Sequence, residues 1–184
     1  MYRMKTRVLI FLFMLCSLSL DAQIRLEGYR QTDINPELLT GRWKAHWISM
    51  PGEPANVYGV YHMRKTFELD EVPSRFIVHV TADNRYKLYL NGRFVSLGPA
   101  RGDIYNWSFE TVDLAPYLRK GKNTLASVVW NYAERKPVAQ ISYDQTGFIL
   151  QGNTGHEAVV NTDTTWVCLR NKAYAPWTEW QVLG

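Results

Sequence analysis

Hydrophobic and polar residues alternate in short runs along this chain, and turn residues separate the runs. In residues 61–69 the apolar positions Tyr61, Met63 and Phe67 alternate with polar positions such as His62 and Arg64. This period of two predicts a half-exposed β-strand, because successive side chains of a strand point to opposite faces. Runs of the same kind predict strands at residues 43–48, 76–82, 109–112, 138–143, 147–151 and 165–169.

Residues 124–130 differ from the other runs because they are almost wholly apolar. A continuous apolar run of this length predicts a strand that is buried on both faces, and we expect it at the centre of a sheet. The polar stretch Gly121-Lys122-Asn123 leads into it.

The dipeptide Asn91-Gly92 predicts a hairpin, because it tolerates the two positive φ angles of a type I′ turn. Counting outward from this turn predicts an antiparallel register that begins with Leu90 opposite Arg93 and ends with Tyr86 opposite Leu97. Because side chains alternate between faces, the predicted core face of the hairpin holds Tyr86, Leu88, Leu90, Val95 and Leu97.

Helical signals are limited to single turns. Asn35 as cap, Pro36 at the first helical position and Gly41 as the stop predict one turn, and Asp113 is predicted to cap another over residues 114–118. Many short strands without a long helix predict an all-β fold, an antiparallel β-sandwich or jelly roll.

Length and composition bound the size of this fold. The chain has 184 residues, of which 46% are hydrophobic and 14% aromatic. This is enough for one proper core and too little for two sizeable domains. We expect a β-sandwich over residues 43–170, preceded by a lead-in segment at 23–42 and followed by a tail at 171–184.

The first 22 residues have the layout of a secretory signal peptide. Arg3, Lys5 and Arg7 precede an apolar run, and the small residue Ala22 ends the segment. We expect cleavage before Gln23 and a secreted or periplasmic protein. A membrane anchor would need about 20 apolar residues, and a lipoprotein signal would use Cys16 but lacks the small preceding residue; both are weaker alternatives.

Charge and cysteine content exclude several classes of function. The formal net charge of +4 falls to +2 once residues 1–22 are removed, and no long basic run remains. We therefore expect no nucleic-acid partner, and no membrane span after signal removal. Cys168 would be the single remaining cysteine, and its apolar surroundings predict a buried strand thiol rather than a nucleophile.

Several motifs together resemble a known family. They are residues 82–86 (ADNRY), 90–93 (LNGR), 98–103 (GPARGD), Trp107, 121–123 (GKN) and 129–130 (VW). Over residues 43–152 the chain resembles the N-terminal β-sandwich region of bacterial α-L-rhamnosidases. It is more loosely similar to the sugar-binding jelly rolls of β-galactosidase-type hydrolases, so the resemblance implies a galactose-binding-domain-like fold.

The resemblance implies a function that this chain would fulfil only in part. In the family, the hydrolytic carboxylates lie in a separate helical barrel that follows such sandwiches, and no matching segment is found before Gly184. We expect residues 171–184, with Trp177 and Trp180, to be a truncated interdomain continuation. The expected partner is the catalytic domain of the same or an adjacent polypeptide.

Candidate binding residues cluster after the hairpin. An aromatic ring that can stack on a sugar is combined there with groups that can bind hydroxyls. The candidates for binding a rhamnose-containing glycan are Arg101, Asp103, Asn106, Trp107 and Glu110, together with Asn84 and Arg85 before the hairpin. The competing interpretation is that Arg101 and Asp103 only pin the loop, by pairing with each other or with Glu110.

Other chemistries find little support in the sequence. Glycoside hydrolysis needs two facing carboxylates roughly 5 to 9.5 Å apart, and strand alternation places no such pair among Asp103, Glu110 and Asp113. The four histidines show no metal-ligand spacing, so we expect neither metal nor cofactor. Residues 101–103 (RGD) match an adhesion tripeptide, but the family loop explains them. The prediction is a non-catalytic carbohydrate-recognition or packing domain, with a purely structural scaffold as the alternative.

Overall fold

The computed structural model of this chain describes residues 33–176. The predicted signal peptide at residues 1–22, most of the predicted lead-in, and Trp177 and Trp180 of the predicted tail lie outside the described residues.

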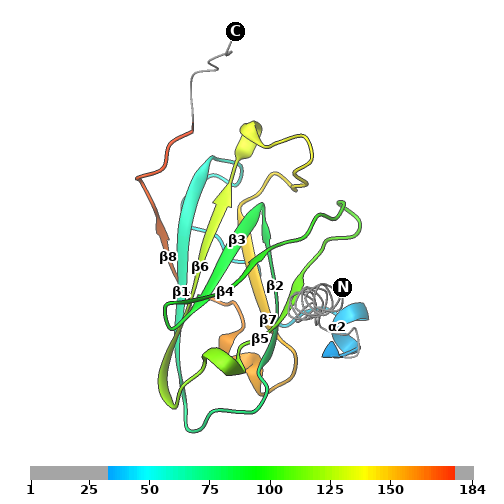
Figure 1. Cartoon of the computed structure of the whole chain (residues 1–184). Coiled ribbons are helices and arrows are strands. Elements are labelled where there is room, and N and C mark those ends of the chain that lie inside the picture. The colour runs from blue at the N-terminus through cyan, green and yellow to red at the C-terminus, as the bar shows by residue number, and fades with distance from the viewer. Residues whose placement is uncertain (1–32, 177–184) are drawn as a thin grey trace, which may run out of the picture. The chain divides into compact units, whose positions relative to one another are not determined.

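Two antiparallel sheets form the fold, and they face each other as the layers of a sandwich (Figure 1). The five-stranded sheet has the order β4-β3-β6-β1-β8, and the three-stranded sheet has the order β5-β2-β7. Their bounds are β1 Gly59–Leu69, β2 Ile77–Asp83, β3 Arg85–Leu90, β4 Arg93–Gly98, β5 Glu110–Asp113, β6 Gly121–Asn131, β7 Gly147–Gly152 and β8 Val167–Arg170. The predicted all-β sandwich is confirmed.

The core lies between the sheets and follows the alternation read from the sequence. Tyr61, Met63 and Phe67 of β1 are buried, whereas His62 and Arg64 are exposed. Strand β6 is central in its sheet, as predicted, but only one of its faces is fully buried and the other is half-buried. Strands β2 and β7 of the three-stranded sheet are instead buried on both faces, because loops cover the side that points away from the core.

The hairpin β3–β4 confirms the turn but not the whole register. Asn91 and Gly92 have φ angles of 53° and 79°, and Tyr89 pairs with Phe94 as predicted. A bulge between Leu88 and Tyr89 then shifts the pairing by one residue. An extra residue in one strand reverses the faces beyond it, so Leu97, predicted to be in the core, is 58% exposed. Val95 is half-buried against the core.

Two predicted strands are wrong. Residues 43–48 form a single bridge, between Ile48 and Phe148. The reason is that two backbone amides of this segment do not bond to a neighbouring strand: Ala45 N donates to the side-chain oxygen of Gln151, and His46 N donates to the carbonyl of Thr162 in a loop. Residues 138–143 form part of a loop, in which the carboxylate of Asp83 binds Ser142 Oγ and Tyr143 N.

The short helical turns occur where the sequence predicts them. Helix α2 spans Glu37–Thr40, and Asn35 Oδ1 accepts a 3.1 Å hydrogen bond from Glu37 N. Asp113 Oδ1 accepts a 2.9 Å hydrogen bond from Ala115 N at the start of the 3-10 turn η2, Ala115–Tyr117. Two further 3-10 turns are η3, Ala133–Arg135, and η4, Glu157–Val160.

Cys168 lies on the edge strand β8 and is half-buried, and burial raises the pKa of its thiol. Within residues 33–176, no helix is long and apolar enough to cross a membrane. No group of three or more His, Cys, Asp or Glu side chains in that same range could hold a metal ion.

Candidate functional site

The outer face of the three-stranded sheet is unusual because it is buried although it points away from the core. Since Val78, Val80 and Ala82 of β2 belong to the core, alternation turns His79, Thr81 and Asp83 to the other side. All three of these outward-facing residues are nevertheless buried. They are covered by three segments, residues 42–47, residues 101–109 and the loop at residues 132–146.

A cleft of about 760 Å³ opens among these covering segments. We call it the aromatic cleft, because Trp43, Trp47, Trp107, Phe109 and Tyr143 line it. The sheet contributes its floor, and polar groups reach it from several segments. The remaining lining residues are Arg42, Ala45, Thr81, Asp83, Gln145, Thr146, Gly147 and Ile149.

Trp107 is fixed in this cleft from two sides. Its indole Nε1 donates a 3.0 Å hydrogen bond to Thr81 Oγ1, which in turn donates a 2.8 Å bond to the carbonyl of Ser108. Its ring stacks on Tyr143, with 5.2 Å between centroids and 26° between planes. The hydroxyl of Tyr143 donates to the carbonyl of Ile104. The two covering loops therefore hold each other through this aromatic pair.

Trp47 offers the cleft an open aromatic surface. Its indole lies over Gly147 of β7, where an added Cβ would stand 2.8 Å from Cε3 of the ring. Glycine thus lets the indole approach the strand closely. Trp47 is 51% exposed and Tyr143 is 57% exposed, so both can still contact a ligand.

Trp43 lines the cleft together with Phe109. Its Nε1 donates a 3.0 Å hydrogen bond to the carbonyl of Leu38, and its ring meets Phe109 edge-on at 5.3 Å. Phe109 also packs edge-on against the buried ring of His79, at 5.5 Å.

His79 supports these rings from within the sheet. Its Nε2 lies 2.9 Å from Asn153 Oδ1 and its Nδ1 lies 3.0 Å from Thr111 Oγ1. Because Asn153 Oδ1 can only accept, Nε2 carries the proton and Nδ1 accepts from the threonine. Burial lowers the pKa of His79, because it disfavours the charged imidazolium.

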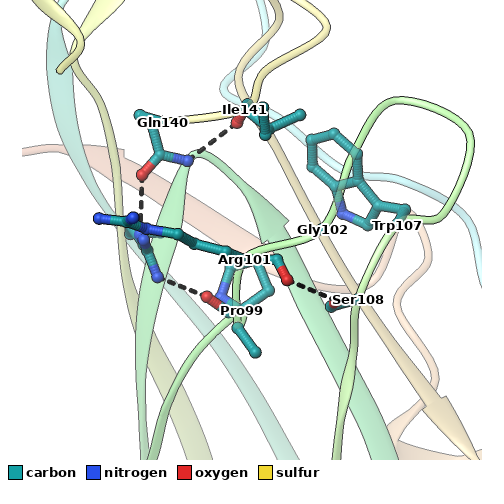
Figure 2. Close-up of a pocket in the computed structure, with 9 residues that line it drawn as sticks. Pro99, Arg101, Gly102, Trp107, Ser108, Gln140 and Ile141 are labelled. Atoms are coloured by element: carbon teal, nitrogen blue, oxygen red, sulfur yellow. Dashed lines mark hydrogen bonds between the residues drawn. The ribbon is translucent and has the colours of Figure 1, made fainter. Parts of the chain in front are cut away.

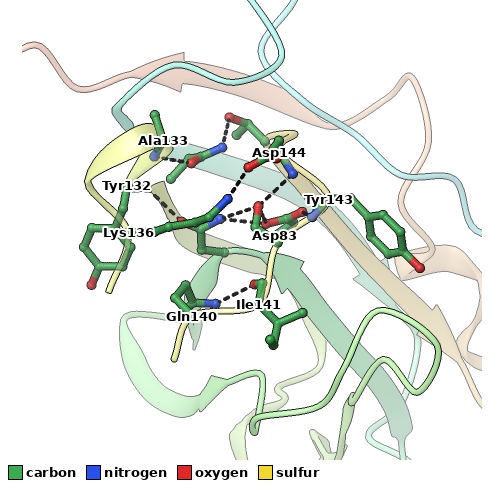
Figure 3. Close-up of polar contacts among 12 residues, drawn as sticks. Asp83, Tyr132, Ala133, Lys136, Gln140, Ile141, Tyr143 and Asp144 are labelled. Atoms are coloured by element: carbon green, nitrogen blue, oxygen red, sulfur yellow. Dashed lines mark hydrogen bonds and ion pairs between the residues drawn. The ribbon is translucent and has the colours of Figure 1, made fainter. Parts of the chain in front are cut away.

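Asp83 anchors the loop that carries Tyr143 (Figure 3). Its carboxylate accepts three hydrogen bonds, from Asn84 Nδ2 at 2.6 Å, Ser142 Oγ at 2.7 Å and Tyr143 N at 2.7 Å. Figure 3 shows the ring of Tyr143 pointing away from Asp83 while its backbone is held there. The ion pair of Lys136 with Asp144 also lies in this loop.

A second, smaller hollow adjoins the cleft and contains two arginines (Figure 2). We call it the arginine crevice, and Trp107 lines it as well as the cleft. Arg85 is held there by a 2.8 Å bond from Nε to Gln140 Oε1 and by a bond from Nη1 to the carbonyl of Pro99. The full lining is Arg85, Pro99, Ala100, Arg101, Gly102, Trp107, Ser108, Gln140 and Ile141.

Glu110 lies behind this crevice and holds the loop that follows β4. Its carboxylate accepts a 2.6 Å bond from Ala100 N and a 3.2 Å bond from the hydroxyl of Tyr86. An added Cβ at Gly98 would stand 2.2 Å from Glu110 Oε2. The first glycine of the GPARGD motif therefore leaves space for this carboxylate. Burial raises the pKa of Glu110 despite these bonds.

The structure brings three of the predicted site residues together, namely Arg85, Arg101 and Trp107, around the crevice. Asp103 and Asn106 instead bond to each other in an exposed turn, with Asn106 Nδ2 at 3.0 Å from Asp103 Oδ2. These bonds, together with those from the backbone of Tyr105 and Asn106, lower the pKa of Asp103. Asp103 therefore pins its loop through Asn106, and not through Arg101 or Glu110.

Asn84 and Glu110, the two other predicted site residues, serve the framework. Asn84 is fully buried, and its Oδ1 accepts a 2.8 Å bond from Tyr132 N. Glu110 is held as described above, at the base of the loop.

Sequence reasoning missed Trp43, Trp47 and Tyr143 as members of the site. The sequence pattern instead predicts one strand that contains Trp43 and Trp47 and another that ends at Tyr143. One signal was available, since Trp43, Ala45 and Trp47 recur with period two and so share a face of an extended segment.

Comparisons with known proteins place this architecture. No protein-family model matches the chain, and no curated protein matches it. Among solved structures, the chain is similar to a GH78 family rhamnosidase of Bacillus sp. GL1, with a TM-score of 0.58 and 26% identity. That match covers 71% of this chain and 14% of the rhamnosidase.

A second solved structure with the same fold is an α-L-rhamnosidase from Dictyoglumus thermophilum, with a TM-score of 0.56 and 22% identity. It covers 73% of this chain and 17% of the enzyme. This chain therefore spans less than a fifth of either enzyme, and the similarity is that of one β-domain. The predicted resemblance is confirmed at this level, whereas an N-terminal position of the domain stays a prediction.

Proposed function

We propose that this chain is a non-catalytic carbohydrate-binding domain of a rhamnosidase-like glycoside hydrolase, with the aromatic cleft as its binding site. The observation that carries the proposal is the convergence of Trp47, Trp107 and Tyr143 from three separate segments on one open cleft. The similarity to a domain of a GH78 family rhamnosidase supports a role beside such an enzyme.

The composition of the cleft suits a sugar. The apolar C–H face of a pyranose packs on an aromatic ring, while its hydroxyls need hydrogen-bonding partners. Trp47 and Tyr143 supply exposed rings, and Arg42 and Gln145 supply polar groups at the same cleft. The volume of about 760 Å³ falls within the range of about 300 to 1,000 Å³ that is usual for small-ligand sites.

Titration with L-rhamnose and rhamnose-containing oligosaccharides, followed by Trp fluorescence and amide chemical shifts, tests the proposal. We expect weak binding, since few ordered contacts must offset the immobilisation of a flexible polar ligand. Trp47→Ala and Tyr143→Ala should abolish the response. Tyr105→Ala is the matched control, because Tyr105 is 87% exposed and lies on the same loop as Trp107 without lining the cleft. No response to millimolar sugar would contradict the proposal.

We propose no hydrolysis by this chain itself. Asp103, Glu110 and Asp113 each accept hydrogen bonds that hold a loop or turn. The purified protein should therefore not turn over an aryl α-L-rhamnoside. Turnover that is lost in Asp103→Asn or Glu110→Gln would overturn this part of the proposal.

The proposal includes export through residues 1–22, as the sequence predicts. N-terminal sequencing of the protein from its native host should find Gln23 as the first residue. Recovery of Met1 from a cytoplasmic fraction would contradict export.

A scaffold role is the second candidate, in which this domain packs against the catalytic domain of the same or an adjacent polypeptide. Apolar side chains on the edge strands of the five-stranded sheet favour it, since Phe94, Leu97, Val167 and Leu169 are all exposed. Exposed apolar residues of this kind often mark an interface. A silent sugar titration, together with co-sedimentation with a rhamnosidase catalytic domain that Leu97→Lys and Leu169→Lys abolish, would favour the scaffold.

A further inference from the structure

We infer that the glycan bound in the aromatic cleft is acidic, and that its carboxylate is held by Arg85 and Arg101 in the arginine crevice. This inference rests on the proposed function and adds the class of sugar, which is one that contains a uronic acid.

The lining of the crevice contains two arginines and no acidic residue. Its charged lining residues are Arg85 and Arg101. Within residues 33–176, neither guanidinium forms an ion pair, and the guanidinium of Arg101 makes no hydrogen bond. Figure 2 shows the side chain of Arg101 directed away from the ring of Trp107. A guanidinium without an acidic partner suits a carboxylate, to which it can donate a charge-assisted hydrogen bond.

The neighbouring acidic residues are turned to other partners. Asp103 binds the backbone of its own turn and Asn106, and Glu110 binds Ala100 N and Tyr86. Glu110 offsets part of the charge of Arg85. Arg101 is exposed and has no acidic partner within residues 33–176, and Arg42 adds another positive charge at the adjoining cleft.

The two volumes decide which part of the ligand lies where. The crevice has room for about 10 Å³, which is roughly the space of one water-sized group. It can take a carboxylate oxygen but not a sugar ring. The cleft of about 760 Å³ can take the rings. Trp107 lines both hollows, so a ring against this indole can extend its carboxylate into the crevice.

Arg85 is already ordered for this role. Bonds to Gln140 and to the carbonyl of Pro99 fix its guanidinium, and its second amino group makes no hydrogen bond to residues 33–176. A side chain held in place loses little conformational entropy when it binds, which favours affinity.

The experiment compares two probes that differ only in charge. One is a disaccharide of D-galacturonic acid linked to L-rhamnose, and the other is its carboxyl-reduced, neutral form. Calorimetric titrations of the full chain at low salt give the ratio of the two dissociation constants. We expect the acidic probe to bind about ten-fold more tightly, as one charge-assisted hydrogen bond would give, and the ratio to fall as salt screens the charges.

Variants locate the effect. Arg101→Gln and Arg85→Gln should each bring the ratio close to one, and because the ratio is measured within one variant, a general loss of folded protein does not alter it. Arg64→Gln is the matched control, since Arg64 is exposed on β1 away from both hollows, and it should keep the wild-type ratio.

Each other outcome overturns a different statement. Equal affinity of the wild type for both probes overturns the inference and leaves the proposed function in place. A preference that persists in both arginine variants overturns the assignment to the crevice. Binding of neither probe overturns the inference and the proposed function together.

Discussion

The indole of Trp107 is bonded to Thr81, a residue of the central strand of the three-stranded sheet, through a 3.0 Å hydrogen bond. Thr81 is almost fully buried and uses the same hydroxyl to donate to the carbonyl of Ser108. One hydroxyl of the sheet therefore sets the position of the loop and of its aromatic ring.

Thr81→Val should destabilise the protein and weaken sugar binding. Valine has the same shape but leaves the indole N–H and the Ser108 carbonyl without partners, which costs about 1 to 3 kcal/mol in the free energy of unfolding. Urea unfolding measures this change. Thr66→Val, at an exposed position of β1, is the control and should change stability by less than about 0.5 kcal/mol. Equal stability of the two variants would show that the hydroxyl of Thr81 does not hold the loop.

Gly147→Ala should impair the cleft more than the fold. The added methyl group would stand 2.8 Å from the ring of Trp47, so the indole must move away from β7. We expect a changed Trp fluorescence spectrum and a loss of sugar affinity of about ten-fold, equivalent to roughly 1.4 kcal/mol. Gly155→Ala is the matched control, because its Cβ would meet no atom within 4 Å. Unchanged affinity in Gly147→Ala would mean that the position of Trp47 does not matter for binding.

Asp83→Asn should release the loop at residues 132–146. The amide cannot accept at both ends, so at least one of the bonds from Ser142 and Tyr143 is lost, at about 1 to 3 kcal/mol. Hydrogen exchange of the Tyr143 amide should become faster. Asp144→Asn in the same loop removes only a partly exposed ion pair with Lys136, worth about 0 to 1 kcal/mol. Comparable exchange rates in the two variants would contradict the anchoring role of Asp83.

Glu110→Gln should change how stability depends on pH. Burial raises the pKa of Glu110 above its ordinary value, so between these two pKa values the folded state binds more protons than the unfolded state. Wild-type stability therefore decreases as the pH rises through this interval, which begins near the ordinary glutamate pKa of about 4.3.

Because glutamine does not titrate, the difference in free energy of unfolding, variant minus wild type, should become more positive as the pH rises through that interval. Urea unfolding at a series of pH values measures it. Glu68→Gln, at an exposed position of β1, serves as the control. A difference that is constant or falls with pH would show that the carboxyl of Glu110 is not destabilised by burial.

Most of the strands could be predicted from the sequence, because their side chains alternate against one core. Tyr61, Met63 and Phe67 show this for β1, and the Asn91-Gly92 turn shows it for the hairpin. The shifted pairing of Leu88 could not be predicted, since a bulge changes the pairing without a change in hydrophobic pattern. Residues 138–143 alternate like a strand, yet the buried carboxylate of Asp83 holds them in a loop.

The candidate site could be predicted only where its residues belong to the motifs on either side of the hairpin. Arg101 and Trp107 lie in the loop after the hairpin, and Arg85 lies directly before it. Trp47 and Tyr143 lie in segments far from that loop along the chain, and only the packing of these segments on the outer face of β2 and β7 brings them together.

The pairing of β1 with β6 at the middle of the five-stranded sheet has a kinetic consequence. Residues 59–69 pair with residues 121–131. The sheet therefore cannot be completed until two segments that are far apart in the sequence have come together. The hairpin β3–β4 needs only its own turn, but its partner in the sheet is again β6. Sheets built on such distant pairings fold in milliseconds to seconds rather than microseconds. We therefore expect the hairpin to form early during refolding. The later pairing of β6 with both β1 and β3 should then determine the observed refolding rate.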